Sequence, residues 1–154
     1  MAFVPIEPCM NARILAALVL AVGLGCGAPP TPEQEVRAAL DALEAAAERG
    51  DASAFAELVS PAYSDPYGHD RDELRAFVAF QLMQSGRGRE VIVRVRDVSF
   101  TDPARAVVSL SVGLAGSRRL GADVYAVDMD LLREGDAWHV SWAQWHAAPA
   151  TDLL

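Results

Sequence analysis

Helical periodicity dominates the chain from residue 32 to residue 85. In the first stretch, apolar residues recur every three or four positions, which is the spacing of one buried helix face: Val36, Leu40, Leu43 and Ala47. Thr31 and Gln34 match a capping box, and Gly50 follows as a typical helix end. This pattern predicts a first helix from Pro32 to about Arg49.

Two shorter helices are predicted between Gly50 and Gly88. The first opens at Asp51, turns three apolar residues inward and stops at Pro61; these residues are Phe55, Leu58 and Val59. Residues 63–69, YSDPYGH, are rich in turn formers and predict a loop. Asp70 caps the next predicted helix, whose apolar face consists of Leu74, Phe77, Val78 and Leu82.

After Arg89 the apolar residues alternate with polar ones, which predicts strands. Four strands are expected, at about residues 90–100, 104–114, 123–133 and 138–142. A slip of one residue near Arg96 predicts a β-bulge. One face of each strand is apolar, including Trp138, Val140 and Trp142 in the last strand, and the other face is polar. An antiparallel sheet covered on one side is therefore expected.

The order of these elements resembles the nuclear transport factor 2-like superfamily. Three segments carry the resemblance: the Gly50-Asp51 junction, the Asp65-Pro66-Tyr67-Gly68 loop and the closing Gly135-x-x-Trp138-x-Val140 hairpin. The loop is most similar to ketosteroid isomerase and the SnoaL-type polyketide cyclases. The resemblance implies an α+β fold, a cystatin-like cone over residues 32–147 with three N-terminal helices in the concave face of a curved, mainly four-stranded antiparallel sheet. It also implies an apolar cavity.

An apolar run at residues 14–25 precedes the domain. The run is too short to cross a bilayer as a helix and suits the core of a signal peptide. Translation could start at Met1 or at Met10, since Met10 begins a more ordinary leader. We interpret residues 1–25 as a signal peptide, residues 26–31 as the start of the mature chain and a tether, and residues 148–154 as a C-terminal tail.

Cys26 directly follows Gly25 and the apolar run, and this arrangement resembles the lipobox of bacterial lipoproteins. The resemblance implies a lipid on Cys26, so that the membrane is contacted through the lipid anchor alone. Because Gly27 rather than aspartate follows Cys26, the expected place is the outer membrane, facing the periplasm. Cleavage after Ala28, giving a secreted or periplasmic soluble protein, stays open as the alternative.

Length and charge exclude several classes of protein. The chain has 154 residues, enough for one domain, and a net charge of −8, which argues against a nucleic-acid partner. The two cysteines, Cys9 and Cys26, both precede the domain, so the domain offers no disulfide and no thiolate metal site. The three histidines have no zinc-motif spacing, and we predict neither a metal nor a cofactor.

Asp65 is the sharpest catalytic candidate. The isomerase-like relatives place a carboxylate base in an Asp-Pro-x-Gly loop at the cavity mouth, so the resemblance implies a general base at Asp65. The alternative is that Asp65 caps the turn before Pro66. Those isomerases also stabilise an enolate with a tyrosine and a protonated aspartic acid. The corresponding positions fall on the apolar Leu43 and Met129, unless a slip of one residue brings in Asp128.

The missing enolate donors favour a non-catalytic envelope lipoprotein whose cone binds an apolar small molecule or an envelope protein. The expected ligand-binding residues are Leu43, Tyr63, Tyr67, His69, Tyr125, Met129 and Trp142. Two alternatives remain: an isomerase, cyclase or hydratase that uses Asp65, and a structural adaptor whose cavity is filled by its own side chains. A homodimer is left open.

Overall fold

The computed structural model describes residues 28–86, 90–115 and 122–154. The predicted signal peptide, both candidate start sites and Cys26 lie outside the described residues. Within the described part, no helix is both long and apolar enough to cross a membrane.

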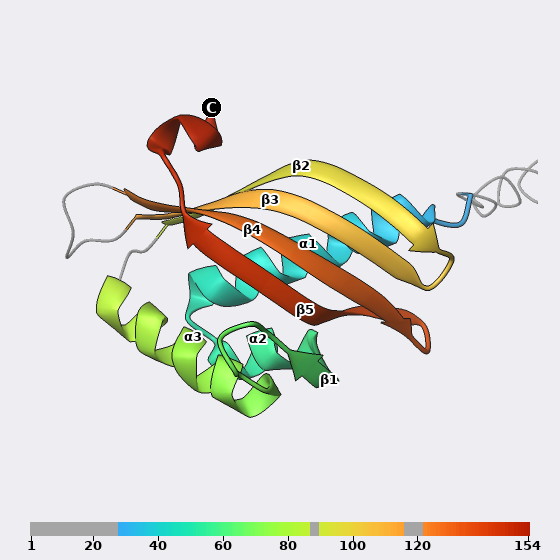
Figure 1. Cartoon of the computed structure of the whole chain (residues 1–154), viewed down its shortest axis with the longest axis horizontal. Coiled ribbons are helices and arrows are strands. Elements are labelled where there is room, and N and C mark those ends of the chain that lie inside the picture. Colours follow the sequence, from blue (N-terminus) through green and yellow to red (C-terminus); the bar gives the residue numbers. More distant parts are fainter. Residues whose placement is uncertain (1–27, 87–89, 116–121) are drawn as a thin grey trace, which may run out of the picture.

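Three helices lie on one side of a curved sheet (Figure 1): α1 (Pro32–Arg49), α2 (Ala52–Glu57) and α3 (Arg71–Ser85). The predicted capping box at Thr31 is confirmed, and Gly50 ends α1 in the left-handed conformation, with φ of 71°. Asp51 and Asp70 cap α2 and α3 as predicted. These local signals therefore set the starts of the three helices and the end of α1.

The sheet has five strands in the order β1-β5-β4-β3-β2. The four long strands are antiparallel neighbours: β2 (Glu90–Asp102), β3 (Arg105–Ala115), β4 (Ala122–Glu134) and β5 (Ala137–Ala147). The predicted bulge occurs between Val95 and Asp97. The α+β fold class, with three helices packed on a curved and mainly antiparallel sheet, is confirmed.

The strand β1 (Val59–Ser64) corrects the sequence prediction. We expected the second helix to run to Pro61 and a loop to begin at Tyr63, but α2 ends at Glu57 and the next residues pair with β5 in parallel. Pro61 is compatible with this strand because β1 is the edge of the sheet, where a missing N–H is tolerated. Val59 and Tyr63 are buried in the core from this strand.

An irregularity in β5 corrects the predicted face of Trp142. Asp130 pairs with Trp142 while the next residue, Leu131, pairs with Val140, so Ser141 is an extra residue. Its hydroxyl donates to the Asp130 carbonyl at 3.2 Å. The extra residue reverses the alternation after Val140, and Trp142 lies with Arg105 and Asp130, on the face of the sheet away from the helices.

Contacts between distant segments hold α1 against the sheet. The Trp138 indole N–H donates to Glu35 at 3.1 Å, and Arg133 forms an ion pair with the same carboxylate at 2.9 Å. The buried core between the helices and the sheet includes Val36, Leu40, Leu74, Val108 and Leu131.

The C-terminal segment predicted as a tail forms a short 3-10 helix, η1 (Ala150–Leu153), on the convex side of the sheet (Figure 1). Asp152 pairs with Arg96 at 2.8 Å. Leu153 lies directly over Gly113, where a Cβ would be 2.5 Å from the leucine Cδ1. The end of the chain is therefore packed against the outer face of the sheet.

Candidate ligand-binding cavity

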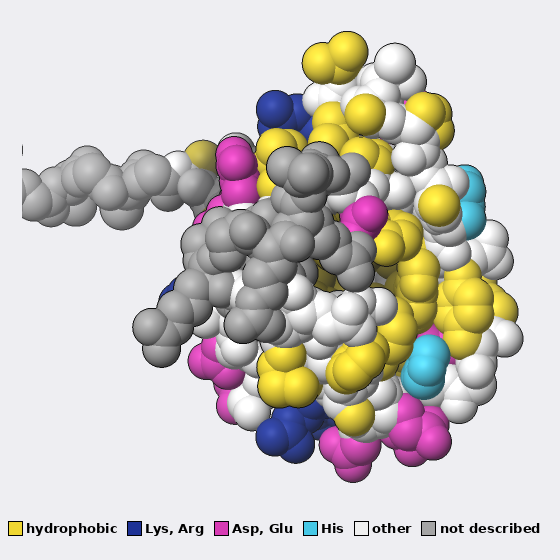
Figure 2. Space-filling model, turned by 90° about the vertical axis from the view of Figure 1, so that its left-hand side faces the viewer, with side chains coloured by type: hydrophobic (Ala, Val, Ile, Leu, Met, Phe, Trp, Pro, Cys, Tyr) yellow, Lys and Arg dark blue, Asp and Glu magenta, His cyan; other side chains and the backbone are white. Residues whose placement is uncertain are grey.

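A cavity of about 260 Å³ lies between α1, α3 and the concave face of the sheet. Its walls are almost entirely aliphatic and aromatic, and include Leu43, Phe77, Leu110, Val112, Tyr125, Met129 and Trp145. The lining reaches the end of the cone where α1 and α3 terminate. Hydrophobic side chains gather on that end of the molecule (Figure 2).

Four of the predicted ligand-binding residues line this cavity: Leu43, Tyr63, Tyr125 and Met129. Tyr67, His69 and Trp142 do not, and neither does Asp65. Trp145 stands in the wall instead of Trp142 because of the extra residue in β5. Trp145 was not among the predicted ligand-binding residues, because a bulge in one strand is fixed by its pairing with the neighbouring strand.

The Asp65 side chain is fully buried in its own loop, where it accepts four hydrogen bonds. Oδ1 accepts from the backbone N–H groups of Tyr67 and His69, both at 2.9 Å. Oδ2 accepts from the Tyr63 hydroxyl at 3.1 Å and from His69 Nδ1 at 2.9 Å. Gly68, at φ of 88°, donates to the Asp65 carbonyl and closes the turn. The whole loop is thus folded around one carboxylate.

These contacts determine the charge state of the loop. Burial alone raises the pKa of the Asp65 carboxyl, but the hydrogen bonds from His69, Tyr63 and Tyr67 outweigh burial and lower this pKa below its ordinary value. Burial, followed by the adjacent Asp65 charge, raises the pKa of the Tyr63 hydroxyl. An ionised carboxylate can only accept, so the His69 proton shared with Asp65 belongs to Nδ1.

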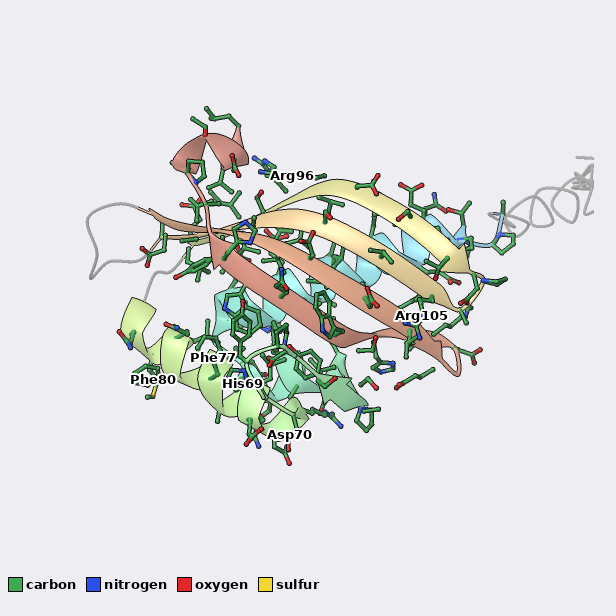
Figure 3. All side chains as sticks on the ribbon, in the orientation of Figure 1. His69, Asp70, Phe77, Phe80, Arg96 and Arg105 are labelled. Carbon is green, nitrogen blue, oxygen red and sulfur yellow. The ribbon has the colours of Figure 1, made fainter. Side chains whose placement is uncertain are left out.

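Aromatic rings connect this loop to the cavity wall. The His69 ring lies 5.5 Å from Phe77 and 6.3 Å from Trp145, measured between centroids, and is close to parallel with Trp145. Figure 3 shows His69 and Phe77 close together between the loop and α3. The Tyr67 hydroxyl donates to the Trp145 carbonyl and accepts from the Trp145 N–H at 3.2 Å. The loop therefore supports the cavity from outside.

The two positions at which the isomerase resemblance implies enolate donors are apolar walls of the cavity. Leu43 and Met129 are both buried and both line it. Asp128 does not replace Met129, because its carboxylate accepts from the Ser109 hydroxyl at 2.6 Å and it is absent from the cavity lining. Across the described ranges, no three His, Cys, Asp or Glu residues are grouped so that they could hold a metal ion.

Comparison with solved structures identifies the fold. A candidate dehydratase of the nuclear transport factor 2-like family from Streptomyces avermitilis superimposes with a TM-score of 0.64 at 21% identity, over 78% of this chain and 100% of its own. A candidate scytalone dehydratase from Novosphingobium aromaticivorans gives a TM-score of 0.64 at 8% identity, over 76% and 84% of the two chains.

A Nostoc punctiforme protein of unknown function with a cystatin-like fold gives a TM-score of 0.61 at 14% identity, over 80% of this chain and 98% of its own. Neither a family model nor a curated protein matches the sequence. The chain therefore has a cystatin-like, nuclear transport factor 2-like fold, and at these identities the likeness concerns the fold alone.

Proposed function

We propose that this domain binds a small apolar molecule in the cone without transforming it. The observation that carries the proposal is the apolar cavity of about 260 Å³, which side chains leave unfilled. Pockets of this kind bind through buried apolar area, with a few polar groups that fix orientation. A filled cone would have favoured a structural adaptor. Here Tyr125 and Met129 line the space, and Trp142 lies on the other face of the sheet.

The geometry of Asp65 supports binding over catalysis. A general base needs a free lone pair within reach of the substrate proton, and a pKa near the working pH. Asp65 uses its two oxygens for four donors, its pKa is lowered, and it is not part of the cavity wall. The apolar Leu43 and Met129 leave no donor at the positions where the isomerase resemblance requires one.

The proposal includes an envelope location. A lipid on Cys26 would anchor the chain, and residues 27–31 would separate that anchor from the first turn of α1. The cone would then stand close to the membrane surface, where apolar molecules are concentrated. The apolar run at residues 14–25 supports this part of the proposal.

Native mass spectrometry of the purified protein tests the binding function. We expect a retained small molecule on the wild-type chain and its loss from Ala143→Phe, because Ala143 lines the cavity and the added ring fills it. Ala76→Phe is the matched control, since Ala76 is exposed on α3 and outside the lining. A wild-type chain that retains no molecule, and that no apolar compound stabilises against heat, would contradict the proposal.

A further inference from the structure

Glu44 is the one charged residue among the described residues that line the cavity. Glu44 lies on α1 directly after the buried Leu43. The same helical turn therefore contributes an apolar side chain and a carboxylate to the cavity wall. Glu44 is partly buried, and an ionised group against apolar walls is costly unless a partner compensates the charge. No arginine, lysine or histidine belongs to the described lining. The described part of the cavity wall is therefore apolar, with a negative charge at one place.

One oxygen of this carboxylate has a partner in the protein. Glu44 Oε1 accepts from the Val93 backbone N–H at 3.2 Å. β2 is an edge strand of the sheet, and this bond occupies one of its outward N–H groups. No other hydrogen bond reaches the Glu44 side chain from the described residues. The second oxygen is thus left for a donor that enters the cavity.

The other polar groups of the described wall carry no positive charge. The Tyr63 side chain lines the cavity, and the hydrogen of its hydroxyl is donated to Asp65. The Tyr125 hydroxyl has no hydrogen-bond partner within the part of the chain that the structure describes. The ionised Asp65, behind Tyr63, adds a second negative charge close to the wall. Gln81 is the remaining polar residue of the described lining and has an interaction of its own, so the charge at the described wall is negative.

We propose that the cavity selects an amphiphile with an aliphatic body and a hydrogen-bond-donating head, an amine or an alcohol, whose head binds Glu44, and that it rejects fatty-acid anions. This selectivity rests on the proposed binding function and names its ligand class. An ammonium gains both a charge-assisted hydrogen bond and Coulomb attraction, while a hydroxyl gains the hydrogen bond alone. A carboxylate head would meet Glu44 with like charge in an apolar surrounding.

Three probes with the same alkyl body test the selectivity at neutral pH: decylamine, decanol and decanoate. Titration calorimetry on the full-length chain, purified without detergent, should give decanoate an affinity at least about tenfold weaker than that of decylamine, with decanol between them. Glu44→Gln keeps an acceptor for Val93 and removes the charge. This variant should bring the affinities for decylamine and decanoate to within about threefold of each other.

Two control variants separate the cavity from the acidic surface. Asp41→Asn removes the same charge from an exposed position on α1 and should leave the ranking unchanged. Ala143→Phe fills the cavity and should abolish binding of all three probes. Decanoate that binds the wild-type chain as tightly as decanol overturns the selectivity, whether or not Glu44→Gln folds. So does a ranking that Glu44→Gln and Asp41→Asn leave equally unchanged. If none of the probes binds a wild-type chain that native mass spectrometry shows to be empty, the proposed binding function itself is overturned.

Discussion

Asp65 and His69, four positions apart in one loop, face each other through a 2.9 Å hydrogen bond from Nδ1 to Oδ2. The same His69 donates its backbone N–H to Oδ1 of that carboxylate. His69 also places its ring beside Phe77 and Trp145 of the cavity wall. A carboxylate that the resemblance implies as a base is here the centre of a loop that packs against the cavity wall.

Asp65→Asn should therefore lower stability rather than abolish a reaction. The amide keeps one acceptor and presents an NH₂ group to donors, so we expect a loss of about 2–3 kcal/mol in the free energy of unfolding. Urea denaturation measures this loss. The folded variant should bind apolar probes within about threefold of wild type, because Asp65 is outside the cavity lining. Steroid-isomerase turnover by the wild-type protein that disappears in a folded Asp65→Asn variant would contradict this account.

The lowered pKa of Asp65 predicts how stability depends on pH. The native state holds this carboxylate ionised more strongly than the unfolded state does. Its contribution is therefore complete above the unfolded pKa of about 3.9 and is lost as the pH falls through the lower folded value. The stability difference between wild type and Asp65→Asn should shrink below about pH 4. Denaturation at a series of pH values measures it, and a difference that grows on acidification would refute the assignment.

Ligand binding should be visible in the fluorescence of Trp145 and not in that of Trp142. Trp145 lines the cavity, whereas Trp142 is on the outer face of the sheet. An apolar ligand should change the emission of the wild type and of Trp142→Phe, and the change should largely disappear in Trp145→Phe. Calorimetry on each variant checks that binding itself persists. A change in emission that persists in Trp145→Phe and disappears in Trp142→Phe would contradict this register of β5.

Gly113→Ala should disturb the C-terminal helix η1. The new Cβ would lie 2.5 Å from Leu153 Cδ1, so the leucine must move. We expect a loss of about 1 kcal/mol, within the range for mild overpacking. In a Leu153→Ala background the same substitution should cost much less, because the contact is gone. Equal costs in both backgrounds, measured by thermal or urea denaturation, would show that η1 does not rest on Gly113.

Cys26→Ser tests the proposed anchor. The variant should lose labelling by a fatty-acid analogue, since serine cannot carry the thioether-linked lipid. Wild type and Cys9→Ser, the matched control, should both keep the label and remain with the membrane fraction. Unchanged labelling of Cys26→Ser would remove the lipid anchor from the proposal without affecting the binding function of the cone.

Local signals in the sequence were enough for the starts of the helices and for most of the sheet. Thr31, Asp51 and Asp70 cap their own helices through bonds spanning two or three residues, and such bonds depend on nothing distant. Alternation likewise identified the four long strands, because each strand buries one face. The three-helix, curved-sheet arrangement followed from this order and from the resemblance that it carries.

Tertiary structure decided the features that local sequence patterns left undetermined. Residues 59–64 have a helix-compatible beginning and a proline, yet they form β1 because β5 offers a free edge. Trp142 and Trp145 exchange faces because one strand inserts Ser141 against its neighbour, a choice that involves both strands. Whether Asp65 acts as a base or a structural centre depends on Tyr63 and His69, whose positions only the folded loop fixes. The cavity itself is space left between elements, and a sequence pattern specifies which faces are apolar but not how completely they fill the interior.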